Sequence, residues 1–150
     1  MAIYDGKSGI TVEESLNAIL KAADTDCTAV DSQGYSTVTH CVNVGAPGIT
    51  FGSSNRVDLE LEDSDDNVTF TDVTANTSVV GGTVDSSSIW QVIDADGDCN
   101  AVYVIGYTGG KRYSRVVINF HGTHGTETIF GVTGIQGRPL AGPTASQANK

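Results

Sequence analysis

Apolar and polar residues alternate along much of the chain. In residues 35–45, valines and His40 occupy every second position, with threonines and an asparagine between them. In residues 56–64, a valine and two leucines alternate with Asp58, Glu60 and Glu62. Alternation with a period of two indicates half-buried strands. We therefore expect a strand in each segment, the second with an acidic outer face.

Shorter patterns predict further strands in the remainder of the chain. An Asp/Asn-rich turn is expected at residues 63–67, and the further strands are expected at 68–73, 79–84, 89–93 and 128–137. Two longer segments rich in β-branched and aromatic residues, 101–108 and 111–120, flank the pair Gly109-Gly110. Because both glycines can adopt a positive φ, this arrangement predicts a β-hairpin with a two-residue turn.

The N-terminal segment departs from this alternation. Thr11 and Glu14 have the spacing of a capping box, and Leu16, Ile19 and Leu20 form a stripe with helical spacing. This pattern predicts a short helix. The alternative is an extended arm that runs over a neighbouring subunit.

Short strands separated by turns at regular spacing indicate an all-β fold. We expect an antiparallel β-sandwich, jelly-roll-like, over residues 28–139, preceded by an extended or short-helical segment over residues 1–27. Residues 140–150 contain a proline and no apolar pattern, so a flexible tail is expected there. A length of 150 residues suits a single domain.

Composition excludes several classes of protein. The formal net charge is −10, which disfavours binding to nucleic acid. No run of residues approaches the length of an apolar membrane span, and the N-terminus lacks a signal-peptide pattern. The three cysteines are widely spaced, so we expect reduced, mostly buried thiols, as in a protein that folds in a cytoplasm.

Charge is distributed unevenly along the sequence. Residues 1–100 carry 17 acidic and 3 basic residues, whereas residues 101–150 carry 1 acidic and 5 basic residues. This asymmetry makes oppositely charged side chains candidates for ion pairs within or between subunits. The candidate subunit or partner contacts are Lys111, Arg112, Arg115, Arg138, Asp58, Glu60 and Glu62.

Three motifs suggest chemistry but match it poorly. Residues 94–98 resemble the start of a calcium loop, yet Cys99 and Ile105 occupy positions where an EF-hand needs Gly and Glu, so an Asp/Gly turn is expected and a different kind of calcium site is the alternative. His121 and His124 lie in a Gly-rich loop with no helix to align them. Residues 106–112 lack the first glycine of a phosphate-binding loop. We therefore predict no enzymatic activity, cofactor or metal.

Three segments resemble a family of small virion proteins of tailed bacteriophages, typically encoded beside the major capsid protein. The first, EDSDDNVTFTDV over residues 62–73, is similar to the E-SDD-(S/T)-(F/W/Y)-V segment of the family, the second reads YVIGYTGGKRYSR over residues 103–115, and the third is the G-x-P of residues 137–139. Residues 28–38 resemble the entry strand of the family. The similarity covers about residues 28–139.

This resemblance implies a structural protein on the virion, made in the host cytoplasm, that binds the outer capsid surface as a decoration or cement protein. Its implied partners are the major capsid protein and further copies of itself, as a homo-trimer or homo-dimer, with no nucleic acid and no membrane. Two alternatives stay open: a head–tail connector or tail subunit, and a carbohydrate-binding module. Aromatic residues that would serve such a module are Trp90, Tyr103, Tyr107 and Tyr113.

Overall fold

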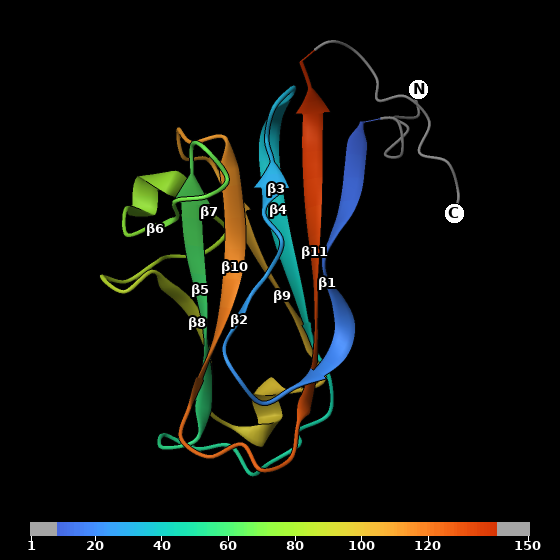
Figure 1. Cartoon of the computed structure of the whole chain (residues 1–150), viewed down its shortest axis with the longest axis vertical. Coiled ribbons are helices and arrows are strands. Elements are labelled where there is room, and N and C mark those ends of the chain that lie inside the picture. Colours follow the sequence, from blue (N-terminus) through green and yellow to red (C-terminus); the bar gives the residue numbers. More distant parts are fainter. Residues whose placement is uncertain (1–8, 141–150) are drawn as a thin grey trace.

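The chain folds into two antiparallel β-sheets packed face to face, as the sequence predicts (Figure 1). The computed structural model describes residues 9–140. The first sheet has the strand order β1-β11-β4-β9-β7, and the second has the order β2-β10-β5-β6, with β3 beside β10 and β8 beside β5. The elements are β1 Ile10–Lys21, β2 Thr25–Asp26, β3 Val30–Asp31, β4 Tyr35–Val44, β5 Arg56–Ser64, β6 Thr71–Asp72, η1 Asn76–Ser78, β7 Val79–Val80, β8 Ile89–Ile93, η2 Asp96–Asp98, β9 Ala101–Tyr107, β10 Tyr113–His121 and β11 Thr128–Pro139.

The core lies between the inner faces of the two sheets. In β4 the predicted alternation holds, and the valines and His40 are buried. From the second sheet, Leu59 and Ile118 are fully buried against them. Trp90 packs against both halves of this core. The removal of these apolar side chains from water is the main favourable contribution to folding.

The N-terminal segment takes the extended form rather than the helical one. Strand β1 pairs with β11 along its length, with register shifts between Glu14 and Leu16 and between Leu16 and Ile19. The second shift explains the helical spacing of Leu16 and Ile19: the extra residue in β1 places them, three positions apart in sequence, opposite Val132 and Phe130, which are two positions apart on β11. Leu16 thereby reaches the core beside Val132. Within the described residues, this segment is an edge strand of its own sandwich.

The predicted hairpin at Gly109-Gly110 is wrong. Strand β9 pairs with β4 and β7 in the first sheet, whereas β10 pairs with β2, β3 and β5 in the second. Residues 108–112 therefore cross from one sheet to the other, and neither glycine has a positive φ. The physical reason is burial: strands in opposite sheets can direct Ile105 and Ile118 into the same core from both sides.

The structure also bears on the predictions for the short strands, the cysteines and the C-terminal tail. The strands expected at 68–73 and 79–84 shorten to β6 and β7. The thiols of Cys27 and Cys99 are buried, and Cys41 is half-buried. Burial raises the pKa of Cys27 to about 12. In the expected tail, Leu140 donates its backbone N–H to Gly34, and the other positions lie outside the described residues. No helix within residues 9–140 is long and apolar enough to cross a membrane.

Candidate functional site

The first two family-like segments meet at one end of the sandwich, where β5 ends and β10 begins (Figure 1). The register places Arg115 opposite Glu62 and Tyr113 opposite Ser64. Strand β3 flanks β10 on its other side. We call this region the motif end and define it by Asp26, Asp31, Glu62, Asp63, Lys111, Arg112 and Arg115.

Arg115 is the most enclosed cation of the motif end. Its Nη2 lies 2.6 Å from Glu62 Oε2 and 3.0 Å from Asp26 Oδ2. The guanidinium carbon stands 4.0 Å from the centre of the Phe70 ring. This cation is therefore held by two carboxylates and one aromatic face, all from its own chain.

Lys111 and Tyr107 converge on Asp63 and tie the two sheets together. Lys111 Nζ lies 2.7 Å from Asp63 Oδ1 and also contacts the Thr71 hydroxyl. The Tyr107 hydroxyl donates to Asp63 Oδ2 at 2.9 Å and accepts from the Lys111 backbone N–H at 3.2 Å. Burial, then the hydrogen bond to Asp63, raises the pKa of Tyr107. Because Tyr107 belongs to the first sheet and Asp63 to the second, this cluster fixes the crossover of residues 108–112 from β9 to β10.

The third ion pair lies nearer to solvent. Arg112 donates to both oxygens of Asp31, at 2.8 Å from Nε and 2.6 Å from Nη2. The hydrogen bond from Arg112 lowers the pKa of Asp31. Exposed pairs of this kind contribute little to stability, typically about 1 kcal/mol or less.

The expected turn at residues 63–67 is built around Asp66. Its Oδ1 accepts the backbone N–H groups of Val68 and Thr69 and the hydroxyl of Ser64. The two backbone hydrogen bonds and then the one from Ser64 lower the pKa of Asp66 to about 2. Asn67 has a φ of 59°, which asparagine tolerates better than most residues.

The remaining candidate contacts lie elsewhere. Asp58 is fully buried, so the expectation of an acidic outer face is wrong at that position. It lies 2.9 Å from Arg56 Nε and 3.0 Å from His121 Nε2, and two partners of this kind make the buried carboxylate tolerable. Glu60 accepts from the Asn119 side chain at 3.0 Å, and burial raises its pKa. Arg138 is exposed at the end of β11, with a φ of 54°.

Thus the structure brings Lys111, Arg112 and Arg115 to acidic partners within the chain, and of the predicted acidic partners only Glu62 is among them. The partners Asp26, Asp31 and Asp63 were missed, because no local sequence signal links residues so far apart. A role for any of these side chains in contacts with another subunit or a capsid stays a prediction.

Sequence analysis also missed a polar bridge inside the core. His40 Nε2 lies 2.8 Å from the Ser114 hydroxyl, which joins β4 to β10 across the two sheets. His40 is fully buried, and this burial lowers its pKa to about 4. Its Nδ1 has no hydrogen-bond partner among residues 9–140. The inward position of His40 in the β4 alternation was the available signal.

The two motifs considered for metals use their side chains in local hydrogen bonds. Asp98 Oδ2 accepts the backbone N–H groups of Asp94 and Ala95, and Asp96 Oδ1 accepts that of Phe51. His124 contacts the His121 carbonyl at 3.0 Å. Among residues 9–140, no group of three or more potential ligands is arranged to hold a metal ion.

Three of the four aromatic residues considered for sugar binding, Trp90, Tyr103 and Tyr107, contribute to the core instead. Tyr107 is buried, and Tyr103 packs on the core while its hydroxyl donates to the Asp98 carbonyl at 2.8 Å. Trp90 is partly buried against both core clusters. Tyr113 lies beneath the Arg112 guanidinium, whose carbon is 4.9 Å from the ring centre. These rings are not arranged as an open stacking platform.

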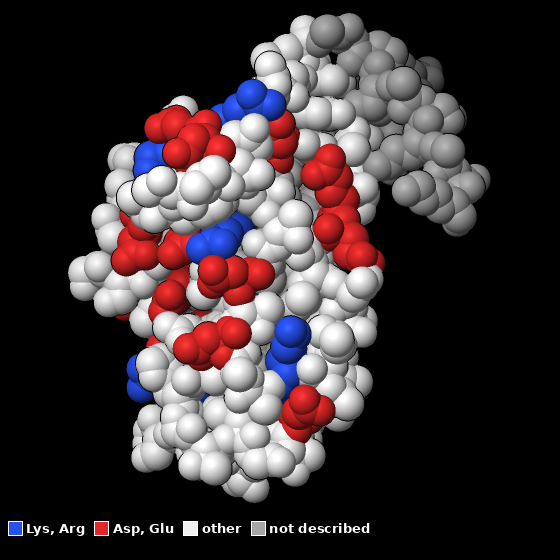
Figure 2. Space-filling view, viewed as in Figure 1, with Lys and Arg blue, Asp and Glu red and all other residues white. Residues whose placement is uncertain are grey.

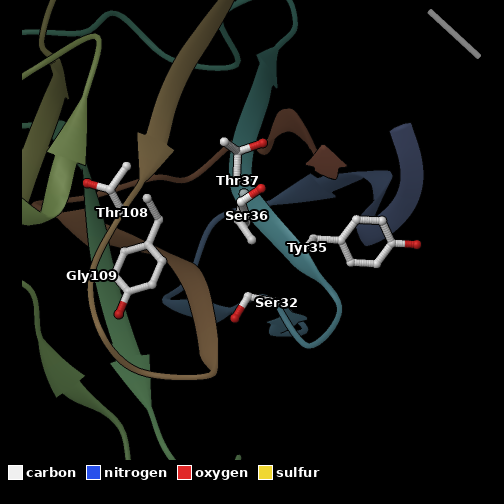
Figure 3. A pocket seen from close by; sticks show the side chains of 8 residues that line it. Ser32, Tyr35, Ser36, Thr37, Thr108 and Gly109 are labelled. Atoms are coloured by element: carbon white, nitrogen blue, oxygen red, sulfur yellow. The ribbon is translucent and has the colours of Figure 1, made fainter. Parts of the chain in front are cut away.

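A small pocket adjoins the motif end, between the start of β4 and the crossover. Its volume is about 140 Å³, and it is lined by Ser32, Tyr35, Ser36, Thr37, Val38, Tyr107, Thr108 and Gly109. Figure 3 shows the strand with Ser36 and Thr37 on one side of the pocket and the segment with Thr108 and Gly109 on the other, whereas the Tyr35 ring points away. The Tyr35 hydroxyl is paired with Thr11 at 2.6 Å. A space of this size suits a few water molecules rather than a sugar or nucleotide.

The two sheets differ in the chemistry of their outer faces. Over the second sheet, acidic and basic side chains interleave, and Figure 2 shows these groups on the viewed face. On the outer face of the first sheet, β9 and β7 expose valines that carry no charge: Val80, Val102 and Val104. Ile129 of β11 is also exposed. The molecule therefore offers one charged and one largely uncharged face.

No protein-family model and no curated protein sequence matches this chain. The fold is similar to that of the PBSX exported protein XepA, with a TM-score of 0.55 and 15% sequence identity. That alignment covers 100% of this chain and 44% of the XepA chain, so this chain spans less than half of the XepA length. An alignment with the VP2 subviral particle of infectious bursal disease virus has 9% identity, covers 92% of this chain and 45% of that chain, and reaches a TM-score of only 0.30. The likeness to XepA shows the sandwich fold.

Proposed function

We propose that the protein is a structural virion protein of a tailed bacteriophage, which binds the outer surface of the capsid and stabilises the shell. The observation that carries this proposal is the motif end. The segments 62–73 and 103–115, which resemble the phage family, assemble into one ion-paired unit that joins the two sheets. The resemblance thus concerns residues that form one physical unit.

The surface chemistry supports a role in assembly. A small sandwich can bridge neighbouring capsid subunits through many modest contacts, and repeated contacts give an avidity that no single interface provides. The net charge of −10 limits binding to the packaged genome. We propose no enzymatic activity, cofactor, nucleic acid or membrane partner. The partners are the major capsid protein and further copies of this chain, in a closed dimer or trimer.

The fold is compatible with this proposal. XepA is described as an exported protein of PBSX, and its similarity to this chain is one of fold. The side chains at the motif end are occupied by structural contacts, which suits a scaffold for assembly better than a site for chemistry. The protein would be made in the host cytoplasm and end on the capsid surface.

The proposal is tested by mixing the purified full chain with expanded heads that lack decoration. Sedimentation of the heads followed by densitometry should give a saturable, fixed number of copies per capsomer, and a reconstruction should place them on the outer surface. Heads already decorated serve as the control and should take up none. Failure to bind undecorated heads at any concentration, or assembly into a six-fold or twelve-fold ring that binds only at the head vertex, would overturn the proposal.

A further inference from the structure

Strand β9 has an open edge over most of its length. Its pairing with β4 is continuous from Ala101 to Tyr107. On the other side, β7 pairs only with Gly106 and Tyr107. The chain then turns away at Gly81, which has a φ of 85°. In the described part of the chain, residues 101–105 consequently have no strand beside them on this side.

The backbone groups at this edge point outward. The Thr108 N–H donates to the Ser78 carbonyl, next to the register pairs Val79–Tyr107 and Val80–Gly106. Because backbone groups alternate in direction along a strand, the even-numbered residues of β9 direct their N–H and C=O groups towards the side of β7, and the odd-numbered ones direct theirs towards β4. The N–H and C=O groups of Val102 and Val104 therefore point into the open edge.

This edge lacks the protection found at the opposite edge of the same sheet. Strand β1 carries Glu13, Glu14 and Lys21 and two register shifts, which are features that discourage pairing with other chains. Strand β9 carries no charge, no proline and no register shift. The side chains of Val102 and Val104 are 62% and 49% exposed. An unprotected edge of this kind is a template for strand addition.

We propose that an extended segment of the capsid shell protein adds to this edge as a strand antiparallel to β9 and in line with β7. This inference rests on the proposed function, since it names the surface through which the shell is bound. The segment would continue the direction of β7, so its C-terminal end would pass the turn at η2. There Asp94 and Asp96 are exposed and have no ion pair among residues 9–140. The segment of the shell protein would therefore carry alternating apolar residues, which lie beside Val102 and Val104, followed by a basic residue, which lies near Asp94 and Asp96.

A second copy of this chain fits the edge less well. If β9 paired with its twin about a two-fold axis at Tyr103, the twin's residue 100 would lie opposite Gly106. Val80 already occupies that position. The twin would also bring its own acidic turn, with a chain of net charge −10, to the same interface.

The test uses the full chain and a defined probe: an acetylated heptapeptide of alternating valine and threonine that ends in two lysines. A matched peptide ends in two glutamates. Fluorescence anisotropy at low salt should show saturable binding of the lysine peptide and about tenfold weaker binding of the glutamate peptide. The lysine peptide should also slow amide hydrogen exchange at Val102 and Val104.

The variant Val104→Pro removes an edge N–H that β4 does not use, and it should weaken binding of the lysine peptide by about tenfold or more. Val104→Thr keeps the N–H and the branched side chain and should bind within about twofold of the original protein. If Val104→Pro fails to fold, Val102→Lys replaces it, because lysine on an edge strand discourages strand addition. No saturable binding, or equal binding by the blocking variant, overturns the inference. Equal binding of the original protein and the blocking variant to undecorated heads also overturns the inference while leaving the proposed function intact. Peptide binding without head binding overturns the proposed function and the capsid shell protein as the occupant, and shows only that the edge of β9 accepts a strand.

Discussion

At the scale of single residues, Gly109 sets the geometry of the crossover. A Cβ built at Gly109 would lie 2.4 Å from the Tyr107 hydroxyl oxygen, so no larger residue fits without moving the ring. A displaced ring would lose its bond to Asp63. We predict that Gly109→Ala lowers the free energy of unfolding by about 1–3 kcal/mol, measured by urea denaturation.

The neighbouring glycine provides the control. A Cβ at Gly110 would meet no atom within 4 Å, so Gly110→Ala should change stability by no more than about 0.5 kcal/mol. If both variants lose stability equally, flexibility of the loop rather than the close approach to Tyr107 explains the need for glycine. If neither does, the Tyr107–Asp63 contact contributes nothing measurable.

His40 predicts a dependence of stability on pH. Its pKa falls from 6.5 to about 4 on burial. As the pH drops below 6.5, His40 therefore becomes protonated in the unfolded chain while it stays neutral in the folded chain. The contribution of a neutral His40 is therefore complete above pH 6.5 and is lost progressively down to about pH 4. A shift of this size corresponds to roughly 3 kcal/mol.

The measurement is the free energy of unfolding from pH 7 to pH 4, compared with that of His40→Gln. The amide can approach Ser114 as Nε2 does, but it does not titrate in this range. The difference between the two proteins should shift in favour of His40→Gln as the pH falls. Parallel curves would show that His40 is protonated in the folded protein without cost.

At the scale of elements, β1 is the clearest case of a pattern with two interpretations. Leu16, Ile19 and Leu20 have helical spacing, yet in the strand a register shift places Leu16 opposite Val132 and Ile19 opposite Phe130, and Leu20 lies opposite Ile129. Leu16 packs on the core, whereas Leu20 is 49% exposed. We predict that Leu16→Ala costs about 2 kcal/mol of unfolding free energy and Leu20→Ala no more than about 0.5 kcal/mol. Equal effects in thermal or urea unfolding would mean that β1 is not docked in this register.

Local patterns predicted the elements that depend on local chemistry. The alternation in residues 35–45 and the Asp66 turn were both visible, because inward valines and self-bonding aspartates act within a few residues. The hairpin failed because two glycines indicate a turn but do not say which sheet the next strand joins. The prediction of a short helix in the N-terminal segment failed for the same reason, since the bulges of β1 are visible only in its register with β11.

At the scale of the whole molecule, the acidic first two thirds and the basic last third of the sequence do not form separate acidic and basic regions in the fold. Folding brings three cations of the last third to acids of the first two thirds: Lys111 to Asp63, Arg112 to Asp31, and Arg115 to Glu62 and Asp26. The predicted opposition of charges was right in kind, but its partners are set by topology over separations such as the 81 residues between Asp31 and Arg112. The motif end could be assembled only once the strand order was known.

This internal pairing leads to a prediction about the capsid contact. Because Arg112 and Asp31 satisfy each other, exchanging them in the double variant Arg112→Asp, Asp31→Arg should keep the ion pair while reversing the charge at each position. We expect this variant to bind undecorated heads within about twofold of the original protein, since an intramolecular pair offers little to a partner. The measurement is the same sedimentation assay, with thermal unfolding to verify the fold. Loss of head binding by a folded double variant would make Arg112 or Asp31 a direct contact with the shell, and would move the docking surface from the open edge of β9 to the motif end.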